Sequence, residues 1–336
     1  MTMVMHGHRS VARVWAACCA VLLLLVLASL TYGAGDVAPS SIWLSLVGQG
    51  DAEARFMLME LRVPRTLLAI FVGAALGIAG VVLQAVTRNP LAEPGLLGVS
   101  AGASFAVVLA ISLGGAAATL HLGIAVGGAL AGCLLVLLVT QMRDVGDDPV
   151  RLVLAGAAFS GILTALSTLI LLYDQRSADE IRFWIIGALG GRPVETLAWS
   201  VPGVILGLAI LLPAIRPLAA LALGEQIATG LGHHPKLTRL WALVSVAILV
   251  GTATAAAGPI VFVGLVVPFV ARRFVGPDIR RTLGLSCLIG PAILLFADTV
   301  SRLVVKPYEL PVGVVTAMVG APVLIAIVRS HRLPRL

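Results

Sequence analysis

Charged residues are scarce in this sequence of 336 residues. Asp, Glu, Lys and Arg together make up 12% of the chain, and Lys236 and Lys306 are its only lysines. Soluble domains carry about 25% charged residues. Because 59% of the residues are hydrophobic and the mean hydropathy is +1.06, the composition excludes an ordinary soluble domain and indicates a polytopic membrane protein.

Residue patterns for catalysis and metal binding are also lacking. There is no G-x-x-x-x-G-K-[ST] sequence, so we do not expect the Gly-rich segment 95–103 to bind phosphate. There is no H-E-x-x-H sequence, and the four cysteines form no C-x-x-C pair. We therefore predict a protein that is not an enzyme and that has no cofactor and no metal site. A membrane-embedded enzyme is the least favoured alternative.

Ionisable residues are rare inside the long apolar segments, where Asp298 is the deepest one. A secondary carrier driven by protons normally needs such residues near the middle of the membrane. A secondary carrier is therefore a less favoured alternative. We expect the energy for transport to come from a partner protein.

Ten apolar segments have lengths near the roughly 20 residues that cross the hydrocarbon layer. With the N-terminus in the cytoplasm, 15 of the 23 Lys and Arg residues fall in inner loops or tails, as the positive-inside rule requires. This bias explains the net charge of +7 without nucleic acid. We predict an all-α, polytopic transmembrane helical bundle with both termini in the cytoplasm. The predicted spans are 12–32, 63–86, 96–113, 121–142, 151–172, 196–214, 237–257, 260–275, 281–300 and 311–329.

An ordered series of motifs carries a family resemblance. The first group is Arg62-Val63-Pro64-Arg65, Gly73-Ala74-Ala75-Leu76, Gln84 and the string NPLAEPGLLGVS at 89–100. The later motifs are LGEQIATGLG at 223–232, AGPIVFVGLVVPF at 257–269 and ADTVSR at 297–302. In this order they resemble the FecCD-type permeases, the membrane subunits of ABC importers for iron–siderophores, haem and vitamin B12. The resemblance runs from about residue 60 to the C-terminus, with Phe269 where the family has histidine.

The resemblance implies a fold like that of the vitamin B12 importer permease and a function in import. We expect a permease subunit in the bacterial cytoplasmic (inner) membrane that moves an iron(III)–siderophore-type chelate. Vitamin B12 and haem are the alternative cargoes. The implied partners are an ABC ATPase subunit, an extracytoplasmic substrate-binding protein, and a second permease that is either a copy of this chain or a paralogue.

The resemblance also assigns roles to residues at the two faces of the membrane. Arg62, Arg65 and Arg302 would form an outer basic pocket for glutamates of the binding protein, and arginine suits this role because its planar fork binds carboxylates. A separate alternative for Arg302 is a pair with Asp298, four residues earlier on the same helix. The inner gate would contain Asn89, Leu91, Pro149 and Val150.

The inner loop 214–236 is predicted to couple the permease to the ATPase. Three small residues in it recur every four positions, which on one helix would create a close-packing face for docking. The coupling residues are Gly224, Glu225, Ala228, Leu231 and Gly232. The chain as a whole, 1–336, is predicted to be a single transmembrane domain, with 62–172 and 237–329 as inverted repeat halves.

Overall fold

The computed structural model describes residues 2–33, 38–114, 118–141, 149–175, 178, 184–305 and 308–329, and within these residues the chain is helical with no strand. This confirms the predicted all-α class. The short elements are α2 (Pro39–Leu46), α3 (Ala52–Phe56), η1 (Met57–Arg62), η2 (Pro94–Leu97) and α10 (Glu225–Gly230). The long helices are α1 (Thr2–Thr31), α4 (Val63–Thr87), α5 (Val99–Ser112), α6 (Ala118–Gln141), α7 (Pro149–Tyr173), α9 (Val194–Leu223), α11 (Pro235–Ala257), α12 (Val263–Val275), α13 (Ile279–Leu303) and α14 (Val312–Arg329).

Each predicted apolar segment overlaps one of these long helices. In the described part of the chain, 6 helices are long and apolar enough to cross a membrane, and three shorter apolar helices accompany them. The protein is therefore a multi-pass membrane protein. Helix length and composition alone do not give ten crossings.

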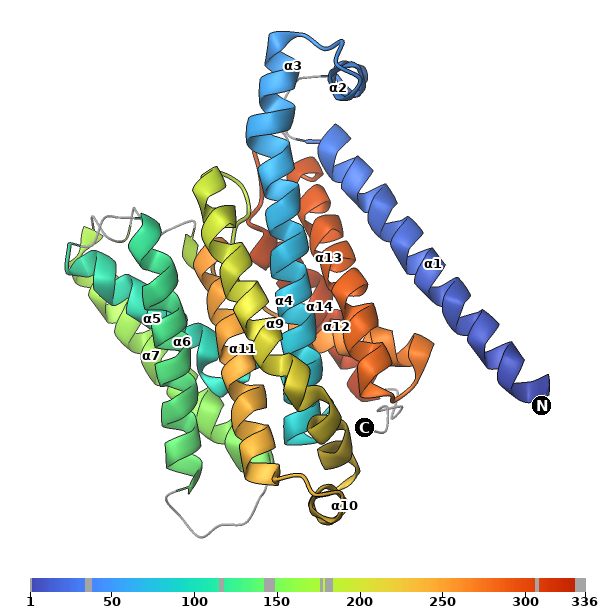
Figure 1. Cartoon of the computed structure of the whole chain (residues 1–336). Coiled ribbons are helices and arrows are strands. Elements are labelled where there is room, and N and C mark those ends of the chain that lie inside the picture. Colours follow the sequence, from blue (N-terminus) through green and yellow to red (C-terminus); the bar gives the residue numbers. More distant parts are fainter. Residues whose placement is uncertain are drawn as a thin grey trace.

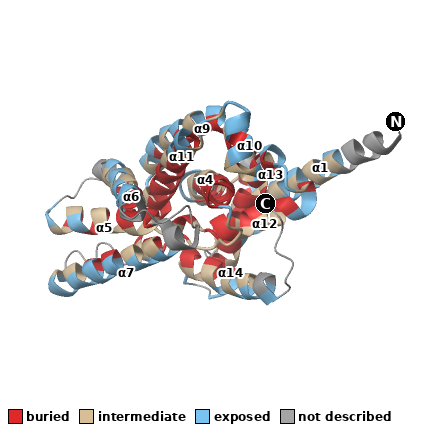
Figure 2. Ribbon diagram, turned by 90° about the horizontal axis from the view of Figure 1, so that it is seen from below, coloured by how far each residue is buried: buried red, intermediate tan, exposed pale blue. Residues whose placement is uncertain are grey.

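Helix α4 lies at the centre of the bundle, with α9 and α11 on one side and α12 and α13 on the other (Figures 1 and 2). Glycines let the neighbouring backbones approach it closely. A Cβ placed on Gly73 would lie 2.7 Å from the carbonyl oxygen of Gly290 in α13, and one on Gly80 would lie 1.8 Å from that of Gly264 in α12. In lipid, helix association depends on such packing because burial of apolar surface gives little driving force.

Two irregular connections run beside α4. The first follows α4, where Arg88 adopts a left-handed conformation (φ 49°), and the second precedes α12, where Phe262 does so (φ 68°). They contact each other, because the backbone N–H of Phe262 donates to Oε1 of Glu93 at 2.5 Å. The buried Gln84 donates to the carbonyl of Ala92 at 3.3 Å. These bonds satisfy backbone groups that the helices leave free.

Helix α1 lies at the edge of the bundle and packs mainly on α13 (Figure 1). Only 11% of its most apolar window is buried within the chain. The ring of Trp15 sits against Gly284, where an added Cβ would be 2.7 Å from the indole. After the C-terminal end of α1, the chain continues through α2, α3 and η1 to the start of α4. This end of the molecule carries the first candidate site.

Candidate functional site

A cavity of about 720 Å³ opens at the end of the molecule where α1 and α13 finish and α4 begins. Its wall contains the three predicted arginines, Arg62, Arg65 and Arg302, so the structure brings them together as predicted. The segments 188–193 and 309–312 complete the wall and add Arg192 and Glu309. The cavity is thus lined by charged groups of both signs.

Asp298 joins two of these arginines from a completely buried position. Its side chain is 0% exposed, and its Oδ1 lies 2.8 Å from Nη2 of Arg65. Its Oδ2 lies 2.9 Å from Nη2 of Arg302, which confirms the predicted i,i+4 pair. Arg65 also reaches Oε2 of Glu309 with Nη1 at 2.7 Å. Two guanidinium groups therefore neutralise a carboxylate that would otherwise be costly to bury.

Arg62 and Arg302 also hold the end of α1. Nη1 of Arg62 donates to two carbonyl oxygens there at 2.9 and 2.7 Å, and Nη1 of Arg302 donates to two more, each at 3.0 Å. The accepting residues are Ser29, Leu30, Thr31 and Tyr32. These carbonyls end a helix and lack intrahelical partners, so cations are favoured beside them.

The contacts that the three arginines make within the chain limit which of them could bind a partner protein. Arg62 is 4% exposed and Arg302 is 2% exposed, and both guanidinium groups are occupied within the chain. Arg65 keeps 11% of its side chain exposed, and its partner Glu309 keeps 38%. The docking role stays a prediction, and the geometry favours Arg65 over the other two.

Arg192 is a cavity residue that the motif analysis missed. It follows Gly190 and Gly191, and its Nε donates to the carbonyl of Ala188 at 3.3 Å. Burial lowers the pKa of the Arg192 guanidinium from its usual value. The sequence did offer one signal for Arg192. It lies on the predicted outer face, where the positive-inside rule does not account for an arginine.

The predicted coupling loop 214–236 is shorter in the structure, because α9 continues to Leu223 and α11 begins at Pro235. Between them lies α10, at the end of the molecule opposite the arginine cavity (Figure 1). Its predicted small-residue docking face is wrong. Gly224 precedes the helix with φ 133° and Gly232 follows it with φ 80°, so neither lies on a helical face. Ala228, the third member, is 1% exposed and packs toward the protein's own bundle. Positive φ is a conformation that glycine adopts readily, and these glycines bound the helix instead of lining it.

The exposed side of α10 carries larger apolar residues. Ile227 is 48% exposed and Leu231 is 62% exposed. Glu225 at the start of α10 forms an ion pair with Arg239 of α11, which fixes the short helix to the bundle. A contact surface on α10 would therefore consist of Ile227 and Leu231, with Ala228 as its internal support.

The predicted gate residues lie in two places. Oδ1 of Asn89 accepts from the backbone N–H of Leu91 at 2.9 Å, which closes a turn directly after α4. Both side chains are partly exposed. Pro149 and Val150 begin α7, and their side chains lie outside the described residues. Helix α7 packs against η2, and Oγ of Ser160 donates to the carbonyl of Gly95 at 3.3 Å.

Residues 21–330 match the model of the FecCD transport family. The chain belongs to this family. Among the relatives of this FecCD-family chain is the ferric enterobactin transport system permease protein FepD of Escherichia coli (strain K12), 42% identical over 92% of this chain and 93% of that protein. The Fe(3+) dicitrate transport system permease protein FecD of the same organism is 40% identical over 83% and 88%.

A solved structure supports the same assignment. It is described as an inward-facing conformation of a metal-chelate type ABC transporter, and it shares 28% sequence identity with this FecCD-family chain. The TM-score is 0.81, and the match covers 95% of this chain and 99% of that one. The chain is thus a membrane permease and not an enzyme.

We predict that Asp298→Asn destabilises the end of the protein that holds the arginine cavity. The change removes the carboxylate partner of the buried Arg302 and leaves Arg65 with Glu309 alone. Removal of one partner from a buried ion pair costs about 3–5 kcal/mol. Thermal unfolding in detergent should show a clearly lowered Tm. The matched control is Asp278→Asn in the same helix, because Asp278 caps α13 and asparagine caps equally well. Equal Tm values for the two variants would contradict the role given to Asp298.

Proposed function

We propose that the protein is the membrane-spanning subunit of an ATP-driven importer that carries an iron(III)–siderophore-type chelate into the cytoplasm. The observation that carries the proposal is the family match over residues 21–330. Its relatives include ferric enterobactin, ferric dicitrate and ferric hydroxamate permeases. Vitamin B12 and haem are the alternative cargoes, because the motif at 89–100 resembles that of the vitamin B12 importer equally well.

The proposed topology has ten crossings and both termini in the cytoplasm of a bacterium. Two similar helix series support inverted halves at 62–172 and 237–329. In the first, α4 is followed by Arg88 in the left-handed backbone conformation and then by the short α5. In the second, α11 is followed by a left-handed residue and the short α12. Inverted repeats of this kind are common in transporters, with irregular segments at the substrate path.

The proposed energy source is a separate ABC ATPase that docks on the inner loop 214–236. Helix α10 supports this role, because it projects from the end of the bundle opposite the arginine cavity (Figure 1). Its exposed Ile227 and Leu231 offer an apolar contact, and the Glu225–Arg239 ion pair ties the helix to α11. A movement of α10 would thereby reach the transmembrane helices.

The proposed role of the outer cavity is to receive the substrate-binding protein. A glutamate of that protein would compete with Glu309 for Arg65, which has the more accessible guanidinium among the three predicted residues. Arg62 and Arg302 would support this contact by fixing the end of α1. The complete importer would contain a second permease, either a copy of this chain or a paralogue.

Transport assays test the function directly. Cells that lack their own ferric-chelate permeases should take up radiolabelled ferric siderophore when this chain is expressed with its ATPase and binding protein. A variant ATPase without its P-loop lysine should abolish uptake. Uptake of cobalamin or haem in place of ferric chelates would favour the alternative cargo. Uptake that continues without the ATPase and collapses with the proton gradient would favour a secondary carrier.

We predict that Ile227→Asp together with Leu231→Asp prevents the ATPase from co-purifying with the permease. The change places two carboxylates in the apolar surface of α10, and desolvating them in an interface is unfavourable. The Tm of the permease alone should be unchanged because both side chains are exposed. Gln226→Asp, also exposed on α10, is the matched control and should keep the ATPase bound. Normal co-purification of the double variant would remove α10 from the coupling surface.

We also predict that Leu91→Gly lets substrate leak without ATP. The proposed gate places Asn89 and Leu91 opposite Pro149 and Val150, and glycine removes the side chain that would close the path. Permease reconstituted in vesicles with trapped ferric chelate should lose it faster than the unchanged protein. Leu113→Gly, exposed in the loop after α5, is the control. Full retention by the Leu91 variant would argue that the turn only ends α4.

A further inference from the structure

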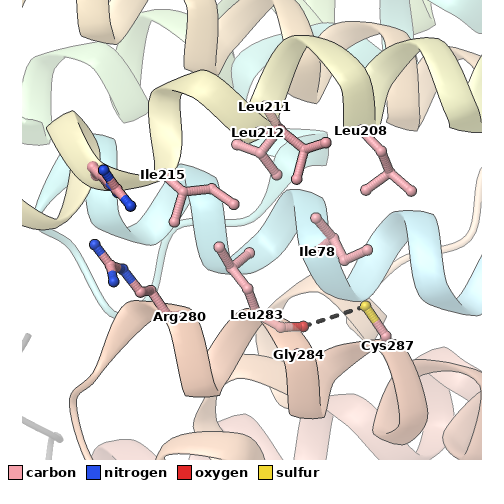
Figure 3. A pocket seen from close by; sticks show the side chains of 10 residues that line it. Ile78, Leu208, Leu211, Leu212, Ile215, Arg280, Leu283, Gly284 and Cys287 are labelled. Atoms are coloured by element: carbon pink, nitrogen blue, oxygen red, sulfur yellow. Dashed lines mark hydrogen bonds between the residues drawn. The ribbon is translucent and has the colours of Figure 1, made fainter.

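A groove of about 460 Å³ runs between α9, α4 and α13 (Figure 3). It shares no lining residue with the arginine cavity. Its walls are almost entirely aliphatic. The side chains that matter most are Leu208, Leu212 and Ile215 of α9, Ile78 of α4, and Leu283 and Cys287 of α13. Leu212 and Cys287 are exposed, so the groove is open to the surroundings of the bundle, which for a membrane protein are lipid.

Two arginines stand at one end of this groove. Arg280 lies at the end of the row of apolar side chains (Figure 3), and Arg216 lines the same cavity from α9. Both are exposed, and neither guanidinium has a hydrogen bond or an ion pair within the described part of the chain. Neighbouring arginines differ, since Arg281 pairs with Asp278 at 3.7 Å and Arg88 donates to the carbonyl of Leu221 at 3.0 Å.

The dimensions fit one leaflet of a membrane. Leu208 and Arg216 are eight residues apart on α9, which corresponds to about 12 Å at ~1.5 Å per residue. Half of the hydrocarbon layer measures about 15 Å. Trp15 packs on Gly284, which also lines the groove, and tryptophan is enriched at the level of the lipid head groups.

We propose that this groove binds an anionic phospholipid, with one acyl chain along α9 and α13 and the phosphate between Arg216 and Arg280. The apolar wall suits a hydrocarbon chain and offers no polar group to a soluble ligand. The two unpaired cations at the head-group level complement a phosphate, and arginine binds phosphate through paired N–H donors. Lipid recognition by basic residues at the ends of transmembrane helices follows the same logic. This inference is independent of the cargo.

Native mass spectrometry of the full-length permease in detergent tests the proposal. Phosphatidylglycerol should bind more tightly than phosphatidylcholine with the same acyl chains. Arg216→Gln with Arg280→Gln should weaken phosphatidylglycerol binding about tenfold or more, because each cation near the membrane surface contributes on the order of 1 kcal/mol. The matched control is Arg273→Gln with Arg281→Gln, which removes the same charge from exposed positions outside the groove. Its binding should stay near that of the unchanged protein.

A second variant separates the groove from the charge. Cys287→Phe keeps both arginines and fills the space proposed for the acyl chain, so phosphatidylglycerol binding should again fall. Equal binding of the two lipids would overturn the proposal, as would equal loss in the variant and control arginine pairs. Displacement of the lipid by millimolar inorganic phosphate would also overturn it, since the site would then select a free anion. One further result would overturn the proposal. The Arg216 and Arg280 variant would bind lipid normally but lose a second permease copy or the ATPase from the complex.

Discussion

Close packing of helices without a hydrophobic driving force is the constraint on which this structure depends. Lipid tails are as apolar as leucine, so the helices must gain their association from tight contact and from satisfied polar groups. The glycines of α4 provide the first: Gly73 and Gly80 admit the backbones of α13 and α12. Once α4 occupies the centre, α9 and α11 cover its remaining side. The position of each irregular segment then follows from where α4 begins and ends.

Satisfied polar groups provide the second requirement, and they gather where helices break or stop. Between α4 and α12, the Glu93 carboxylate accepts from a backbone N–H, and Arg272 pairs with Gln84. At the end that holds the arginine cavity, Asp298 forms ion pairs with Arg65 and Arg302. Arg302 and Arg62 bind the last carbonyls of α1. The ionisable groups of the apolar segments therefore serve first to hold the helices together through hydrogen bonds and ion pairs. This distribution agrees with the proposed use of a separate ATPase.

The helices could be predicted from the sequence because apolar runs of near-spanning length are a strong, local signal. The i,i+4 pair of Asp298 and Arg302 was equally local and is confirmed. The contact between Arg65 and Asp298 could not be predicted, since it joins residues 233 positions apart. The face of α10 was predicted wrongly. The four-residue spacing implied one helix through Gly224 and Gly232, but their φ values of 133° and 80° place them just outside the two ends of α10. Arg192 was missed because no motif surrounds it.

The contacts that hold α1 form with residues that are synthesised at very different times. Its C-terminal end is bound by Arg62, 31 positions after Thr31 in the chain, and by Arg302, 270 positions after Tyr32. The first of these residues leaves the ribosome soon after α1, whereas the second arrives only when nine-tenths of the chain has been made. Until Arg302 has been made, the carbonyls of Ser29 and Tyr32 lack this partner. The oldest part of the nascent protein therefore gains its contacts with α13 only late in synthesis.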